Sequence, residues 1–166
     1  MDDMKPVARL PKWDLISIYP GLDSHEFGTD VERLSAEVIK LRQLVIHDSL
    51  NPLELARILM CYNAALDLAE IVEGYAVCCL LVNSADESAR GWATRTRQAR
   101  TELQLVERRL ATLSASLDDE RSTVWPEALR EHAFWKEQAR IVNAHALSTA
   151  EEDLAIKLNE TGGSAW

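Results

Sequence analysis

Residues 51–82 read NPLELARILMCYNAALDLAEIVEGYAVCCLLV, and the next four residues, 83–86, read NSAD. Asn51 is a favourable N-cap residue, and Pro52 suits the first helical position because no N–H is needed there. A helix is therefore predicted to start here and to run to Val82. Its apolar residues lie on several faces, which predicts a central helix contacted from more than one side: Leu55, Leu59, Met60, Tyr62, Leu66, Ile71, Val72 and Val77.

The residues that follow this turn predict a second long helix. Apolar residues recur there at steps of 4, 3, 4, 3 and 4, as on one face of a helix: Ala99, Leu103, Val106, Leu110, Leu113 and Leu117. The polar turn at 83–86 leaves no room for a crossover, so the helices over 53–82 and 87–117 should pack antiparallel. Each arm would have about 30 residues and a length of about 45 Å.

Three further helices are predicted on either side of this hairpin. One runs from about residue 24 to 46, with a single apolar stripe made of Phe27, Val31, Leu34, Val38, Leu41 and Val45. Another follows Pro126, around Leu129, Ala133, Phe134, Trp135, Ile141 and Val142. The last begins with a capping box, Ser148 and Glu151, and ends at Gly162 and Gly163. The sequence thus predicts an all-α bundle of about five helices.

The chain is predicted to have a proline-rich arm at residues 1–23 and a single helical domain at 24–166. The arm holds three of the five prolines, Pro6, Pro11 and Pro20, which favour extended and turn structure over helix. Glycine and proline together number only 6 + 5 = 11 of 166 residues, and 47% of residues are apolar, which favours long helices. This composition excludes collagen-like, disordered and turn-rich β-sandwich proteins.

Charge and hydropathy exclude several classes of partner. Acidic residues outnumber basic ones 27 to 18, and this net charge of -9 argues against nucleic-acid binding. The longest apolar run, residues 75–82, is far shorter than the ~20 residues that a membrane span needs.

The charged first residues do not resemble a secretory signal, so the protein is expected in the cytoplasm. Of the two interpretations of Cys61, Cys78 and Cys79, small buried side chains are preferred over reactive thiols.

Two groups of residues are candidates for chemistry. His25-Glu26-Phe27-Gly28 begins like the zinc motif HExxH, but Thr29 stands where the second histidine belongs, so a helix start is favoured. No catalytic or metal-binding residue is predicted, because no other recognisable motif is present. Spacings of 7 and 11 residues put three arginines within about 20° on one helix face. That stripe is either a solvated face or a site for an anionic partner: Arg90, Arg97 and Arg108.

Two segments at opposite ends of the chain point to one family. WDLISIYPGLDS at 13–24, followed by Glu26 and Phe27, resembles the amino-terminal signature of the oligoendopeptidase F family, a group of thimet-oligopeptidase-like zinc metallopeptidases. LSTAEE at 147–152 and TGGSAW at 161–166 are similar to two later motifs of the same helical region. The matching motif positions are Trp13, Asp14, Leu15, Tyr19, Pro20, Thr161, Gly162, Ser164, Ala165 and Trp166.

The resemblance implies a noncatalytic amino-terminal domain, either a fragment or a truncated form. In the family this domain forms one wall of a deep channel that admits short peptides. The HExxH zinc site lies in a later domain that this chain lacks, so no cofactor is expected here, and the partners would be a catalytic domain or a peptide. The alternative is a free-standing helical module that binds another protein through an apolar helix face and the arginine stripe. The oligomeric state stays open.

Overall fold

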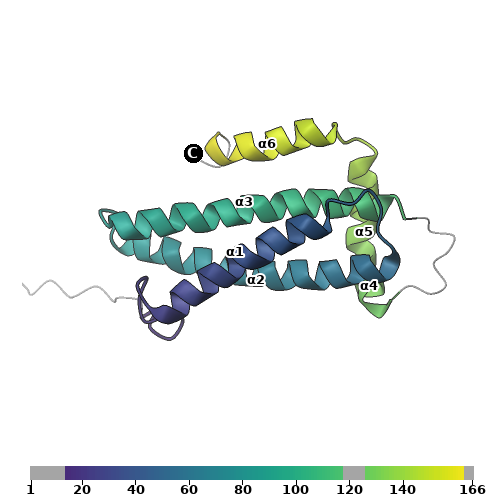
Figure 1. The fold of residues 1–166 in the computed structure, drawn as a ribbon. Coiled ribbons are helices and arrows are strands. Elements are labelled where there is room, and N and C mark those ends of the chain that lie inside the picture. The colour runs from purple at the N-terminus through teal and green to yellow at the C-terminus, as the bar shows by residue number, and fades with distance from the viewer. Residues whose placement is uncertain (1–13, 118–125, 163–166) are drawn as a thin grey trace, which may run out of the picture.

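The computed structural model of the protein describes residues 14–117 and 126–162. These residues form α-helices without any strand, which confirms the predicted all-α bundle (Figure 1). The six helices are α1 (His25–Leu44), α2 (Pro52–Val82), α3 (Glu87–Ala115), α4 (Glu127–Glu131), α5 (Ala133–Asn143) and α6 (Thr149–Thr161). One more helix is present than the five expected, because the helix predicted around Trp135 is divided at His132 into α4 and α5. None of the described helices is long and apolar enough to cross a membrane.

The predicted hairpin of α2 and α3 is confirmed. The contacts between the two helices run in opposite directions, since Glu73 on α2 meets Arg97 on α3 whereas Tyr62 meets Glu107. Capping residues set the starts of both helices, with Asn51 as the N-cap of α2 as predicted. Asn51 and Glu54 form a reciprocal capping box at 2.9 Å in both directions, and the Asp86 carboxylate accepts from the Ala89 N–H at 3.0 Å. These bonds satisfy amide groups that a helix start leaves without partners.

Helix α1 crosses the hairpin and covers one side of it (Figure 1). All members of its predicted stripe are buried, from Phe27 to Val45. The main core lies where this stripe meets α2 and α3, and its fully buried leucines are Leu34, Leu41, Leu55, Leu103 and Leu110. Each such side chain contributes about 1.5–3 kcal/mol by leaving water. Helix α1 ends at Leu44, slightly before the expected end at Ile46, which is exposed.

The described part of the amino-terminal arm, residues 14–23, packs against the helices. Tyr19 is only 4% exposed, and its ring lies 5.3 Å from Phe27 and 5.0 Å from Tyr75 in edge-on geometry. The Tyr75 hydroxyl donates to the Tyr19 carbonyl oxygen at 3.0 Å, and Trp92 on α3 packs against Phe27. A second, aromatic core therefore fixes these arm residues to the end of the bundle.

Removing the Tyr75 hydroxyl should measurably weaken the fold. We expect Tyr75→Phe to lower the free energy of unfolding by about 1–2 kcal/mol, because the buried Tyr19 carbonyl oxygen loses its donor. Tyr62→Phe is the matched control and should lower the free energy of unfolding by less. The Glu107 carboxylate that loses this hydrogen bond is exposed, so water can replace the hydroxyl. Urea denaturation of both variants measures the difference. Equal losses would show that the Tyr75 bond has no special role.

The prediction that α2 is contacted from more than one side is confirmed, because α1, α3 and α4 all pack against it, but one face of α2 stays exposed. Met60 and Ile71 are 61% and 50% exposed, whereas Val72 is fully buried. The exposed face continues through Cys78, so the prediction of buried cysteines is wrong at that residue, whereas Cys61 and Cys79 are half-buried. The reason is that α5 and α6 dock on α3 and leave this side of α2 uncovered. We call this face the α2 stripe, made of Leu53, Met60, Ile71, Cys78 and Val82.

Candidate functional site

The predicted arginine stripe does not form one surface. Arg90 is exposed, and its guanidinium donates to the Ser84 carbonyl oxygen at 2.7 Å. Arg97 lies 3.8 Å from the Glu73 carboxylate on α2. Arg108 is the member that contradicts the solvated-face interpretation, because its side chain is only 14% exposed. The helix wheel could not show this, since α5 and α6 cover only the carboxyl-terminal half of α3.

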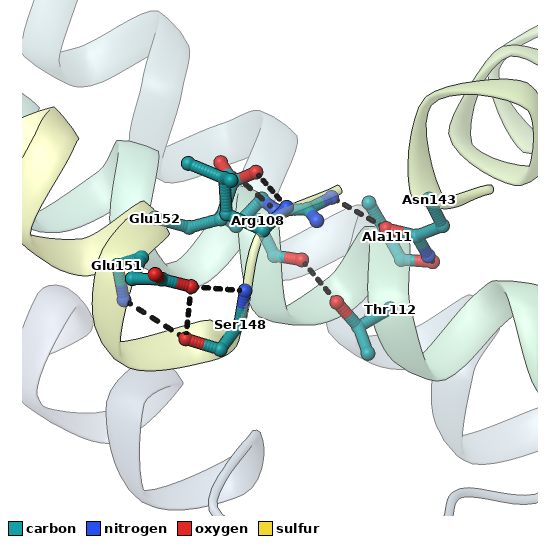
Figure 2. Close-up of polar contacts among 8 residues, drawn as sticks. Arg108, Ala111, Thr112, Asn143, Ser148, Glu151 and Glu152 are labelled. Atoms are coloured by element: carbon teal, nitrogen blue, oxygen red, sulfur yellow. Dashed lines mark hydrogen bonds and ion pairs between the residues drawn. The ribbon is translucent and has the colours of Figure 1, made fainter. Parts of the chain in front are cut away.

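Arg108 instead joins three helices (Figure 2). Its guanidinium Nε lies 3.4 Å from the Glu152 carboxylate on α6, and the same group donates to the side-chain oxygen of Asn143 at the end of α5. The Asn143 amide in turn donates to the Ala111 carbonyl oxygen on α3 at 2.9 Å. These contacts pair the Arg108 charge with Glu152 and link α5 and α6 to α3, so the Arg108 cluster has a structural role and is not an open site for an anion.

Helix α6 begins with the predicted capping box. The Ser148 N–H donates to the Glu151 carboxylate at 2.9 Å, and the Glu151 N–H points back to the Ser148 hydroxyl at 3.4 Å (Figure 2). Hydrogen bonds from Ser148 hold the pKa of Glu151 below its usual range. The neighbouring Glu152 accepts from the Leu147 N–H at 3.1 Å while it faces Arg108. The cap thus aims Glu152 at α3.

An open groove lies between α3, α5 and α6. Figure 1 shows α6 alongside α3, on the side away from α2. No residue of α6 between 149 and 159 is buried, so the helix does not close over α3. The groove has a volume of about 600 Å³, and its apolar lining residues are Ala111, Trp135, Ala139, Val142, Ala155 and Ile156. Its polar lining residues are Gln104, Glu107, Arg108, Gln138 and Asn159.

A smaller pocket of about 280 Å³ adjoins this groove and extends to α2; we call it the Trp135 pocket. Trp135, Gln104 and Glu107 line both spaces. The Tyr62 hydroxyl donates to the Glu107 carboxylate at 3.2 Å. Burial raises the pKa of Tyr62, and the negative charge of Glu107 raises it further, so the hydroxyl stays neutral and keeps its proton.

The motif residues that the structure describes have structural roles. Tyr19 and Leu15 belong to the aromatic core, and the Asp14 carboxylate accepts from the Ile16 N–H at 3.0 Å. Pro20 is exposed within the turns of the arm. Thr161 is the last residue of α6 and Gly162 is its C-cap, with the Gly162 N–H donating to the Leu158 carbonyl oxygen at 2.9 Å. The remaining motif positions lie outside the described residues: Trp13, Ser164, Ala165 and Trp166.

His25 occupies the first turn of α1, as the helix-start interpretation expects. Its Nδ1 atom lies 3.4 Å from the Thr29 hydroxyl, and Ser24 caps the helix by accepting from the Phe27 N–H. Within residues 14–117 and 126–162, no three histidine, cysteine or acidic side chains gather in a way that could hold a metal ion.

Sequence reasoning did not find the groove or the Trp135 pocket. Tyr62 and Glu107 are 45 residues apart in the sequence, and Asn63 and His132 are 69 residues apart. No local spacing pattern therefore connects the members of either pair. Tyr62 could have been paired with Glu107 only from the register of the antiparallel hairpin, in which residue numbers rise along α2 as they fall along α3. Comparisons with protein-family models, curated proteins and solved structures found no match to this chain.

Proposed function

We propose that the chain is a noncatalytic helical domain of the oligoendopeptidase F type, which binds short peptides in the cytoplasm as one wall of an access channel. Hydrolysis would require a separate catalytic domain that carries the zinc site. The motifs at residues 13–24, 147–152 and 161–166 support the family assignment. The groove between α3, α5 and α6 supports the peptide-binding role.

The open, mixed lining of the groove is the observation that carries this proposal. A volume of about 600 Å³ lies within the ~300–1,000 Å³ range of ligand-binding clefts. Apolar side chains such as Val142 and Ile156 can cover the side chains of a peptide, whereas the amides of Gln104 and Gln138 can bond to its backbone. Shape and apolar contact would thus favour short peptides without requiring a fixed sequence.

A bulky side chain in the groove should block peptide binding. We expect Ala155→Trp to weaken the binding of fluorescently labelled short peptides at least tenfold, a loss of about 1.4 kcal/mol, because the indole occupies the groove. Ala155 is exposed, so the fold should tolerate the change. Ala150→Trp, on an exposed part of α6 outside the groove lining, is the control. Fluorescence anisotropy measures the peptide affinity of each variant, and equal affinities for Ala155→Trp and Ala150→Trp would contradict the proposal.

A free-standing interaction module remains the second candidate, and the α2 stripe favours it. This face exposes Met60, Ile71 and Val82 along one side of the longest helix. Apolar faces of this kind mark many protein interaction surfaces. A wild-type chain that does not associate with a separately expressed oligoendopeptidase F catalytic portion would favour this module, and Ile71→Glu should abolish binding to the module's own protein partner if the stripe is the contact. The same variant should leave peptide binding in the groove unchanged.

A further inference from the structure

We propose that the Trp135 pocket is a cation site, which takes the lysine or arginine side chain of a peptide lying in the adjoining groove. This inference rests on the proposed peptide-binding function, because a peptide supplies the occupant. The two spaces share Gln104, Glu107 and Trp135, so a chain in the groove could turn one side chain into the pocket. The argument depends on which charges near the pocket are already neutralised.

Glu107 supplies the charge that a cation would meet. Its carboxylate is exposed and accepts one hydrogen bond, from Tyr62 at 3.2 Å. None of the described cationic side chains lies within ion-pair distance of it. A carboxylate has about four lone-pair positions, so one bond from Tyr62 leaves room for an ammonium or guanidinium group.

The two arginines near Glu107 do not cancel this charge. Arg100 lines the pocket but lies 3.5 Å from the Glu70 carboxylate and 3.9 Å from that of Glu73. Arg108 is paired with Glu152. Glu73 also meets Arg97, so Arg97 and Arg100 face two carboxylates and together form a neutral set. Glu107 is therefore the carboxylate among the described lining residues, and its charge is not paired with an arginine. The lining also includes His132, whose Nε2 atom lies 3.4 Å from the side-chain nitrogen of Asn63.

The size and lining of the pocket fit a basic side chain. The volume of about 280 Å³ is just below the lower limit of ~300 Å³ for pockets that bind small molecules. The pocket therefore suits one long side chain better than a whole ligand. Leu66, which is only partly buried, can cover the methylene stem of lysine or arginine. Trp135 adds an aromatic ring, the type of side chain that attracts cations most strongly.

Single-residue probes test the cation site separately from the groove. We expect N-acetyl-lysine methylamide to shift the NMR signal of the Trp135 indole N–H and to bind at least tenfold tighter than the uncharged N-acetyl-norleucine methylamide. Glu107→Gln should reduce this ratio to about one, because the amide keeps its shape and an acceptor for Tyr62 but has no charge. Glu32→Gln, which removes an exposed carboxylate from α1, should leave the ratio unchanged.

Labelled peptides that differ only by lysine or norleucine distinguish failure of this inference from failure of the proposed function. Peptides that bind with equal affinity would overturn the cation site and leave the groove standing. A lysine preference that survives Glu107→Gln would also overturn the inference. If the lysine probe binds through Glu107 but Ala155→Trp has no effect on peptides, the cation site stands and the groove fails. Absence of any binding, by probes or peptides, would overturn both.

Discussion

Leu103→Asp should destabilise the protein by more than about 4 kcal/mol and leave little folded material at physiological temperature. Leu103 is fully buried where α1, α2 and α3 meet. The substitution removes about 2–3 kcal/mol of apolar burial and forces a carboxylate without a partner into the core, which costs several kcal/mol more. Thermal unfolding followed by circular dichroism measures the effect.

Arg97→Ala is the control for this prediction on the same helix. The side chain of Arg97 is 51% exposed, and its separation of 3.8 Å from Glu73 is typical of a weak surface ion pair. Its loss should change the free energy of unfolding by no more than about 0.5 kcal/mol. Similar melting temperatures for Leu103→Asp and Arg97→Ala would mean that the buried face of α3 is assigned incorrectly.

The features that sequence predicts well are those that depend on local periodicity and capping. The steps of three and four residues through Leu103 and Leu110 reflect the geometry of a single helix, so the buried face of α3 follows from them. Asn51, Asp86 and Ser148 accept bonds from amides only three residues away, so their roles as N-caps could also be predicted.

Features that depend on how distant segments pack could not be predicted in this way. Arg108 has the same wheel position as Arg97, yet it is mostly buried because α5 and α6 return to that half of α3. The exposure of Met60 and Cys78 has the same origin, since no helix returns to their side of α2. The candidate pocket likewise depends on where Trp135 docks, and no pattern within α5 specifies its docking partner.

Arg108→Met should release α6 from the bundle while the hairpin stays folded. The substitution keeps apolar bulk but removes the bond to Asn143 on α5 and the charged contact to Glu152, which is the one that holds α6 and is worth about 1.5–3 kcal/mol in a partly buried setting. Because α6 has no buried residue between 149 and 159, few apolar contacts remain to hold it. We expect a local loss of about 2 kcal/mol, seen as roughly 30-fold faster hydrogen exchange of the α6 amides.

The control for α6 release is Arg90→Met, which removes an arginine from the same predicted stripe. Arg90 lies near the turn of the hairpin and bonds to Ser84, far along α3 from α6, so exchange in α6 should not change. Unaltered α6 exchange in Arg108→Met would mean that contacts such as those of Ile156 hold the helix without the arginine. Equal acceleration in α2, α3 and α6 would mean that Arg108 supports the whole core. Selective acceleration in α6 identifies the Arg108 cluster as the link that keeps the groove in shape.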